Sequence, residues 1–317
     1  MAALYIEAVL CAPALVLLSA AAVRSVIFKR SLTASLVEIY LRLANPRVSK
    51  AKLDKRIERK RQRGYIPYKL PHFAKKQGKI EEIEGVPTAV LGSGSNDTAI
   101  LYLYGGGYFR EPRRHHIKYL IKLSKRSGRK VLAPIYPKAP FATADEARSA
   151  MRSLYLRLSR DFDKIILMGD SSGGGLCLLL LCMLRDEGIR LPGRAILFSP
   201  WVDLSMSAPD TKKYERRDPL IWTESALSTA RSFAGAYPLV SPLVSPLFSE
   251  LTGLCEMDIF VGDRELLYPQ VCELHNKLLQ SGVSHGFRVG CGMNHVYQIY
   301  PIPEARKELA IIADILK

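Results

Sequence analysis

Cysteine is scarce in this chain of 317 residues, and its distribution excludes two common kinds of site. None of the six cysteines has a partner at the two-residue spacing of a zinc or redox motif. No cluster of histidines and carboxylates has the spacing of metal ligands, and no phosphate-binding glycine motif is present. We therefore expect no metal and no cofactor, and we expect the cysteines to act as small apolar side chains in a reducing compartment.

Glycine, by contrast, is concentrated around one serine. Residues 165–175 run from an apolar strand-like segment through Gly169, Ser171 and Gly173 into an apolar helix-like segment. A serine between two such glycines is typical of a nucleophile elbow, a sharp strand-to-helix turn that raises the hydroxyl above the sheet. A side chain at either glycine would collide with neighbouring backbone in that turn. The pattern predicts Ser171 as a catalytic nucleophile.

A second glycine cluster follows an earlier apolar segment. Residues 98–104 are predicted to form a buried strand, and Gly105, Gly106 and Gly107 come directly after it. Taken alone, three glycines favour a flexible turn. Beside a nucleophile elbow they favour a loop whose free backbone N–H groups bind a negatively charged oxygen, with the N–H of Ser172 as a further donor.

A serine nucleophile needs a histidine to accept its proton, and the chain has six histidines. Three precede the elbow in basic or helix-like stretches, where we expect solvated surface positions: His72, His115 and His116. Two more fall in an amphipathic run and at the start of a strand: His275 and His285. His295 lies in a glycine-containing loop between the last strand-like segment and the last helix-like segment. Such a loop can reach over the sheet edge, so His295 is the predicted base.

The carboxylate that orients this histidine is expected after the buried strand-like segment 257–262. Asp263 and Glu265 both follow that segment, and their spacing does not choose between them. One would hold the imidazole of His295, and the other would pair with Arg264 or remain in solvent.

Together these segments resemble the hormone-sensitive-lipase-like branch of the α/β-hydrolase esterases. The stretches that carry the resemblance are residues 104–108, 169–174, 198–204, 245–247, 262–267 and 292–295. The family places its acid at the fourth position of a Gly-x-x-Asp/Glu-x-Leu pattern, which implies Glu265. The resemblance also implies that Gly105, Gly106 and Ser172 supply the N–H groups of an oxyanion hole.

Two positions depart from the family pattern. Tyr104 stands where the family has a histidine before the glycines, and residues 136–140 differ from the usual Leu-Ala-Pro-Glu element. Neither change touches Ser171, Glu265 or His295. Both concern the hydrogen bonds that hold the glycine loop, so the acyl preference of relatives does not transfer to this chain.

Strand-like and helix-like segments alternate along most of the chain, which is typical of a mostly parallel sheet with helices on both faces. We therefore expect residues 81–317 to form an α/β-hydrolase catalytic domain. Between residues 203 and 242 the periodicity weakens and charges cluster, so this segment is expected to be an insertion that helps to cap the site. Residues 29–80 are expected to form a basic helical cap or juxtamembrane segment.

Basic residues are concentrated at the front of the chain. Residues 1–80 hold 17 Lys and Arg against 4 acidic residues, a net charge of +13, and the remaining 237 residues carry only +3. Nine of the bases lie between residues 47 and 63. The interleaved aromatic residues of a base-stacking surface are missing there, so no nucleic-acid partner is expected.

No lysine or arginine precedes the apolar stretch 8–23, whereas Arg24, Lys29 and Arg30 follow it. A secretory signal carries its positive charge in front, so this order disfavours export. Residues 1–28 are expected to form either a membrane anchor, with the catalytic domain facing the cytoplasm, or an apolar cap helix over the site. Helix-like patterns at 31–43 and 50–63 already provide two cap helices, which favours the membrane. Residues 1–63 would then contact an anionic membrane surface.

The expected function is that of a serine carboxylesterase or lipase-like hydrolase working through an acyl-enzyme. The family resemblance implies esters of short to medium acyl chain. The same three side chains would also serve a deacetylase, an amidase or an acyltransferase. A non-catalytic ligand-binding relative is a further alternative, although such proteins typically lose a member of the triad, and all three positions are filled here.

Overall fold

The computed structural model describes the backbone of residues 2–316 and the side chains of residues 15–94 and 97–316. Its centre is one eight-stranded sheet with the order β1-β2-β4-β3-β5-β6-β7-β8. The strands are β1 Gly78–Ile83, β2 Val86–Leu91, β3 Ser95–Leu103, β4 Arg129–Pro134, β5 Lys164–Asp170, β6 Arg194–Phe198, β7 Met257–Gly262 and β8 His285–Gly290. Only β2 runs against the others, because it pairs antiparallel with both β1 and β4.

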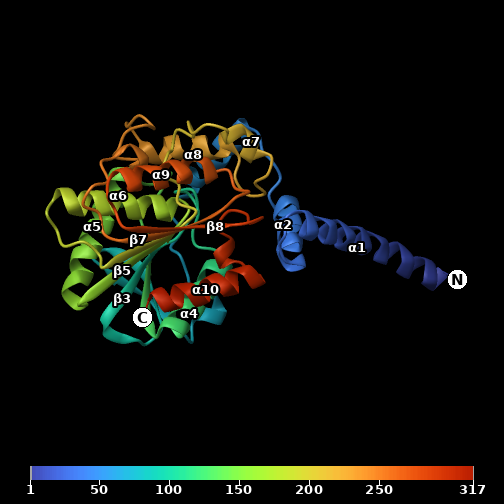
Figure 1. The fold of residues 1–317 in the computed structure, drawn as a ribbon, viewed down its shortest axis with the longest axis horizontal. Helices are drawn as coiled ribbons and strands as arrows, with labels where there is room; N and C mark the ends of the chain where they lie inside the picture. The colour runs from blue at the N-terminus through green and yellow to red at the C-terminus, as the bar shows by residue number, and fades with distance from the viewer. Residues whose placement is uncertain (1, 317) are drawn as a thin grey trace.

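Helices cover both faces of this sheet. The α-helices of this body are α4 Arg114–Ser127, α5 Ala144–Asp161, α6 Ser172–Asp186, α9 Tyr268–Gln280 and α10 Pro303–Ile315. Figure 1 shows α4 and α10 on one face and α5, α6 and α9 on the other. Central strands covered on both faces are expected to be apolar along their whole length, and β5 is buried at every residue after its first. The α/β-hydrolase fold expected from the alternation of segments is confirmed.

The first two strands were not expected from the sequence. β1 contains two glutamates and no fully buried residue, so its pattern lacks the apolar signal of an internal strand. It lies at the sheet edge, where one side of the backbone has no neighbouring strand and polar residues are tolerated. The sheet therefore starts at Gly78, ahead of residue 81, where the catalytic domain was expected to begin.

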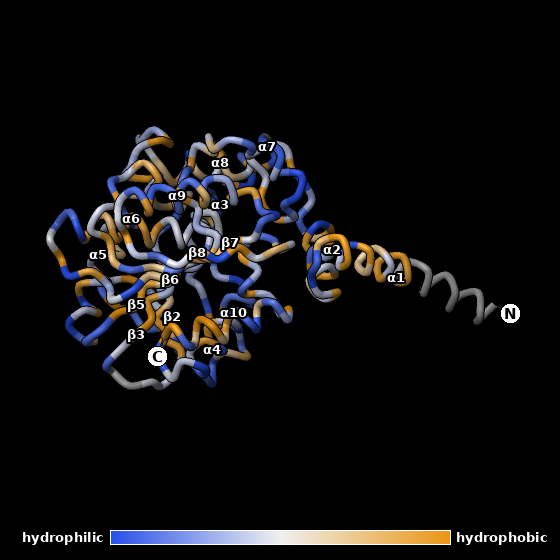
Figure 2. Tube along the Cα trace, in the orientation of Figure 1, coloured by the Kyte–Doolittle hydropathy of each residue, from blue (hydrophilic) through white to orange (hydrophobic). Residues whose placement is uncertain are grey.

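The first helices are α1 Ala2–Ile27, α2 Leu32–Ala44 and α3 Lys50–Arg63. Figure 1 shows α1 extending away from the body of the molecule, and Figure 2 shows that its described part is largely hydrophobic. Leu15, Val16, Val23 and Val26 on this helix are all exposed. Among the residues that the structure describes, no helix combines the length and the apolar character needed to span a bilayer. The side chains of the first half of the expected apolar stretch, residues 8–14, lie outside the described part.

The α1–α2 hairpin is fixed to the body through one buried glutamate. Glu38 on α2 has a fully buried side chain and forms ion pairs with Arg24, Arg30 and Arg42. Arg30 also donates a hydrogen bond of 2.7 Å to the carbonyl oxygen of Gly292, in the loop that carries His295. The hairpin thus contacts one of the loops that build the site described below.

The segment 203–242 contains two helices, α7 Thr211–Glu215 and α8 Thr223–Ala234. Ser228 on α8 donates a hydrogen bond of 2.7 Å to Asp54 on α3, so helices far apart in the sequence are joined. Residues of both α3 and α8 line the pocket that contains Ser171.

Candidate active site

Ser171 stands at the sharp turn between β5 and α6. Its backbone has φ 53° and ψ −125°, a combination that residues other than glycine rarely adopt. A Cβ atom on Gly173 would lie 1.9 Å from the carbonyl oxygen of Leu103, and one on Gly169 would lie 2.7 Å from that of Gly173. Both glycines are therefore required by the close approach of backbone, as the elbow pattern predicts.

The structure brings Ser171, His295 and Glu265 into one line of hydrogen bonds. The distance from His295 Nε2 to Ser171 Oγ is 2.9 Å, and the distance from His295 Nδ1 to Glu265 Oε1 is 3.2 Å. Because a carboxylate only accepts, Nδ1 carries the ring proton and Nε2 is left to accept the proton of the serine hydroxyl. Nε2 is thus positioned to act as a base toward the serine.

Glu265 is held in place by further donors. Its Oε2 accepts hydrogen bonds from the hydroxyl of Ser199 at 2.6 Å and from the backbone N–H of Gly262 at 3.1 Å. The side chain is fully buried, so these neutral donors replace the water that an ionised carboxylate would otherwise require. The hydroxyl of Ser199 in turn accepts from the N–H of Val296, next to His295.

Asp263, the other candidate acid, does not contact the histidine. Its Oδ1 accepts a hydrogen bond of 2.8 Å from the backbone N–H of Gly292. Arg264, its expected partner, lies 3.7 Å from Glu38. Asp263 therefore bridges two loops of the site, and Glu265 is the carboxylate that reaches the ring of His295.

The electrostatic environment of His295 favours its protonated form. Burial by itself disfavours the imidazolium, but the nearby carboxylate of Glu265, its hydrogen bond, and the charges of Asp218 and Asp170 outweigh this effect. As a result, the pKa of His295 is raised above its ordinary value of 6.5.

Asp218 was not expected from the sequence as part of the site. It is fully buried within the segment 203–242 and accepts hydrogen bonds from the backbone N–H groups of Leu266 at 2.7 Å and Leu220 at 2.7 Å. Burial raises the pKa of this carboxyl, although His295 and the two amides oppose the rise. Its sequence context is a charge cluster, which is more typical of a solvated surface.

The prediction that His116 lies at the solvated surface is wrong. Its side chain is buried, and its Nδ1 accepts a hydrogen bond of 3.1 Å from the N–H of Arg113. Nε2 therefore carries the proton and donates to Asp170 at 3.3 Å. Asp170 also accepts from the hydroxyl of Tyr102 at 2.8 Å. His115 is also not fully solvated, because it is half-buried and lines the pocket.

The glycine loop packs directly against the elbow. Gly105 is buried there, and a Cβ atom on it would lie 2.8 Å from the carbonyl oxygen of Asp170. The N–H of Gly106 donates a hydrogen bond of 3.1 Å to the side-chain oxygen of Ser172, the first residue of α6. Gly107 has a φ of +63° and lines the pocket.

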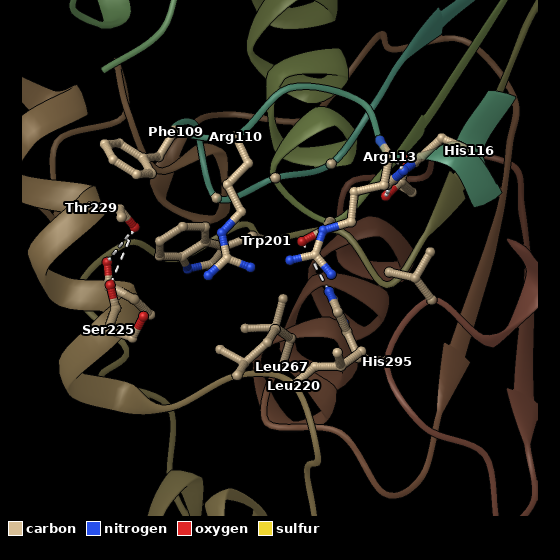
Figure 3. Close-up of a pocket in the computed structure, with 18 of the residues that line it drawn as sticks. Phe109, Arg110, Arg113, His116, Trp201, Leu220, Ser225, Thr229, Leu267 and His295 are labelled. Atoms are coloured by element: carbon tan, nitrogen blue, oxygen red, sulfur yellow. Dashed lines mark hydrogen bonds and ion pairs between the residues drawn. The ribbon is translucent and has the colours of Figure 1, made fainter. Parts of the chain in front are cut away.

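A pocket of about 170 Å³ surrounds Ser171 and His295. Its apolar wall includes Trp201, Leu220, Ile221, Leu267 and Ile299. Figure 3 shows Arg110 and Arg113 reaching into the same space from the loop that follows the glycines. The pocket thus presents the serine hydroxyl between an apolar side and a basic side.

Comparison with known proteins shows which family has this fold and site. A family model described as the alpha/beta hydrolase fold matches residues 100–299. The acetyl-hydrolase of Streptomyces hygroscopicus is 31% identical over 227 residues, which are 69% of this chain and 75% of that protein. The chain belongs to the α/β hydrolases. An esterase of Acinetobacter venetianus is 29% identical over 68% of this chain and 73% of its own length.

A solved structure of an esterase from the bacterial hormone-sensitive lipase family agrees with this α/β hydrolase in fold. It has a TM-score of 0.75 and 28% sequence identity, and the match covers 88% of this chain and 94% of that one. The family resemblance read from the sequence is therefore confirmed.

Tyr104, the departure from the family's histidine, has its own contacts in this hydrolase. Its ring stacks on Tyr136 at a centroid distance of 4.9 Å, and its carbonyl oxygen accepts from the Tyr136 hydroxyl at 2.8 Å. Its own hydroxyl donates to Glu111 at 3.2 Å. The two departures, at 104 and at 136–140, thus contact each other and hold the start of the glycine loop together.

Proposed function

We propose that this α/β hydrolase is a serine carboxylesterase in which Ser171 is the nucleophile, His295 the general base and acid, and Glu265 the residue that orients His295. The observation that carries the proposal is the unbroken hydrogen-bonded line from Glu265 through His295 to Ser171 at the wall of a pocket. Esterase-named relatives and esterase structures of the same fold support the same reaction class.

In the proposed reaction, Ser171 Oγ attacks the ester carbonyl carbon while His295 Nε2 takes the hydroxyl proton. The tetrahedral intermediate collapses, the bond to the alcohol oxygen breaks, and His295 returns the proton to the departing alcohol. Water then attacks the acyl-enzyme while His295 takes its proton, the bond from the acyl carbon to Ser171 Oγ breaks, and His295 returns the proton to Ser171 as the acid leaves. Glu265 stabilises the imidazolium that forms in each half of the cycle.

The oxyanion is proposed to bind the N–H groups of Gly106, Gly107 and Ser172. Gly105 is replaced by Gly107 in this set because Gly106 and Gly107 are partly exposed at the pocket, whereas Gly105 is buried. Ser172 is the first residue of α6, and the first N–H groups of a helix have no partner within it. They also lie at the positive end of the helix dipole, which favours a developing negative charge.

The pocket supports acyl groups of short to medium length. Its volume of about 170 Å³ is modest, and its apolar wall suits a hydrocarbon chain. Deacetylation, amide cleavage and acyl transfer use the same triad, but no feature of this pocket favours them over ester hydrolysis.

We also propose that residues 1–63 contact an anionic membrane surface. The described part of α1 exposes Val16 and Val26, and α3 is rich in lysine and arginine, so apolar and basic groups occur together in this segment. Sedimentation with phosphatidylserine vesicles tests this contact. We expect binding that weakens with salt and is lost on neutral phosphatidylcholine vesicles; equal recovery in the supernatant with both would contradict it.

A panel of 4-nitrophenyl esters from acetate to dodecanoate tests the esterase proposal. We expect the highest kcat/KM at short to medium chains and a loss of roughly 10⁴-fold or more for Ser171→Ala. Labelling of the wild-type protein, but not of Ser171→Ala, by a fluorophosphonate would separate an enzyme from a ligand-binding relative. Full turnover by Ser171→Ala would refute the mechanism.

A further inference from the structure

Three arginines surround the entrance to the pocket that contains Ser171. Arg56 comes from α3, while Arg110 and Arg113 come from the segment between the glycine loop and α4, and all three line the pocket. Figure 3 shows Arg110 and Arg113 pointing toward the space beside His295. All three residues are solvent-exposed, so a ligand can reach their guanidinium groups.

None of these guanidinium groups forms an ion pair within the described part of the chain. The acidic side chains that line the same pocket have other partners. Glu111 pairs with Lys138 at 2.9 Å, and Asp170 pairs with the buried His116 at 3.3 Å. The basic wall is therefore not neutralised by the protein.

Several other arginines, by contrast, form ion pairs with carboxylates of the protein. Arg24, Arg30 and Arg42 all pair with Glu38, and Arg194 pairs with both Glu256 and Asp258. At the pocket the like charges are close enough to act on one another. Surrounding protein, followed by the charges of Arg113 and Arg56, lowers the pKa of Arg110. An anion between them would relieve this repulsion and accept charge-assisted hydrogen bonds.

The basic character continues beyond the entrance. A second cavity of about 610 Å³ shares Arg56, Phe109 and Glu111 with the catalytic pocket. Its other basic lining residues are Arg59, Lys60, Arg63 and Lys69. A substrate with its ester at Ser171 and an anionic end directed outward would therefore meet positive charge along its length.

We propose that the substrate of this esterase carries a carboxylate or phosphate group that binds Arg110 and Arg113, with Arg56 as a third contact. The apolar wall of Leu220, Ile221 and Leu267 holds the uncharged part of the same molecule. This inference rests on the proposed function, because it takes Ser171 as the point of attack.

Matched pairs of esters test the inference. On the acyl side, 4-nitrophenyl butyrate is compared with the 4-nitrophenyl monoester of succinic acid, which has the same number of acyl carbons and ends in a carboxylate. On the alcohol side, phenyl acetate is compared with 4-acetoxybenzoate and with 4-acetoxyphenyl phosphate. Spontaneous hydrolysis is subtracted. We expect kcat/KM to favour the anionic member of at least one pair by about tenfold at low salt, and the preference to shrink as salt rises.

The variants identify the residues responsible. Arg110→Ala and Arg113→Ala should each reduce the anionic-to-neutral ratio of kcat/KM by about threefold, and together they should remove most of the tenfold preference, with partial rescue by Arg110→Lys. Arg231→Ala removes an exposed arginine of α8 that does not line the pocket, and it should leave the ratio unchanged.

The outcomes separate the two proposals. Hydrolysis of the neutral esters with no anionic preference in either pair, or a preference that survives Arg110→Ala combined with Arg113→Ala, would overturn the inference and leave the esterase standing. Hydrolysis of no ester by protein with an intact thermal transition would instead contradict the proposed function. A preference for the succinate monoester would place the anion on the acyl side, and a preference for the benzoate or phosphate would place it on the alcohol side.

Discussion

Two glutamates with fully buried side chains invite comparison, Glu265 in the triad loop and Glu38 in the N-terminal hairpin. Glu265 is surrounded by neutral donors and one imidazole, whose charge changes during the proposed reaction. Glu38 is surrounded by guanidinium groups, which stay charged at any pH the protein meets. The two regions are neighbours, because Arg264 next to Glu265 lies 3.7 Å from Glu38.

The partners decide what each carboxylate can do. Burial would raise the pKa of Glu38, but Arg30, Arg42 and Arg24 outweigh burial and lower it below the ordinary 4.5. That carboxylate therefore stays ionised at neutral pH, and it pairs with Arg30, which donates to the carbonyl oxygen of Gly292. Glu265 instead raises the pKa of its partner His295, the group that gains and loses a proton in the proposed reaction. One buried glutamate thus serves the proposed chemistry, and the other holds the N-terminal helices to the body.

Glu265→Gln should cause the largest effect on activity. The amide can donate to His295 Nδ1, which favours the ring tautomer that cannot accept the proton of Ser171, so kcat should fall by about 10⁴-fold. The measurement is kcat for a 4-nitrophenyl ester, with the urea midpoint to show that folding is retained. A loss of only a few-fold would contradict the role assigned to Glu265.

The pH dependence of kcat/KM tests the same role of Glu265. His295 must be neutral to act as a base, so activity is lost as pH falls through its pKa. Because that pKa is raised, the acidic limb of kcat/KM in the wild-type enzyme should lie above pH 6.5. In Glu265→Gln, the residual activity should show this limb at lower pH. An unshifted limb would mean that another carboxylate, such as Asp218, controls the imidazole.

Glu38→Ala should cause the largest effect on stability. Removing the anion leaves several guanidinium groups close together in a buried setting, and the loss of one partner from a buried ion cluster costs about 3–5 kcal/mol. The urea unfolding midpoint measures this change. Glu58→Ala is the matched control, because Glu58 pairs with Arg61 on α3 with half of its side chain exposed, and its loss should cost less than about 0.5 kcal/mol.

The pH dependence of the unfolding free energy provides a second test of Glu38. A carboxylate whose folded pKa is lowered contributes stability that is fully present above its unfolded pKa, here 4.5, and that is lost as pH falls through the lowered value. The stability difference between wild type and Glu38→Ala should therefore shrink on acidification below pH 4.5. An equal difference at all pH values would show that packing, not charge, sets the effect.

Asp263→Asn should have the smallest effect. The asparagine oxygen can still accept from Gly292 N–H, so the loss of a charge-assisted hydrogen bond should reduce kcat/KM by less than about fivefold. The same ester assay measures it beside Glu265→Gln. Comparable losses in the two variants would remove the distinction between the two candidate acids.

Local pattern was enough to predict the fold class and the residues that meet at the pocket. The elbow at Gly169–Gly173 is a short-range steric requirement, so it is visible in five consecutive residues. The loop with His295 could be recognised from its place between the last strand and the last helix. The choice of Glu265 over Asp263 needed the family resemblance, because two carboxylates two residues apart differ only in which way the loop turns them.

The features that escaped prediction depend on distant partners. Glu38 sits in a helix whose sequence gives no sign of the arginines that reach it from α1 and from residue 264. His116 lies in the basic stretch 113–116 and resembles a surface residue, yet it is buried and donates a hydrogen bond to Asp170. In each case a pairing across the fold overrides the local composition.

The backbone angles of Ser171 have a consequence for attempts to make this protein more robust. A residue held at φ 53° and ψ −125° is strained by its own Cβ, and glycine would be relaxed there. We expect directed evolution that rewards survival of heating, with no assay for turnover, to enrich glycine at position 171. Such a screen would select thermostable variants that lack the hydroxyl of Ser171.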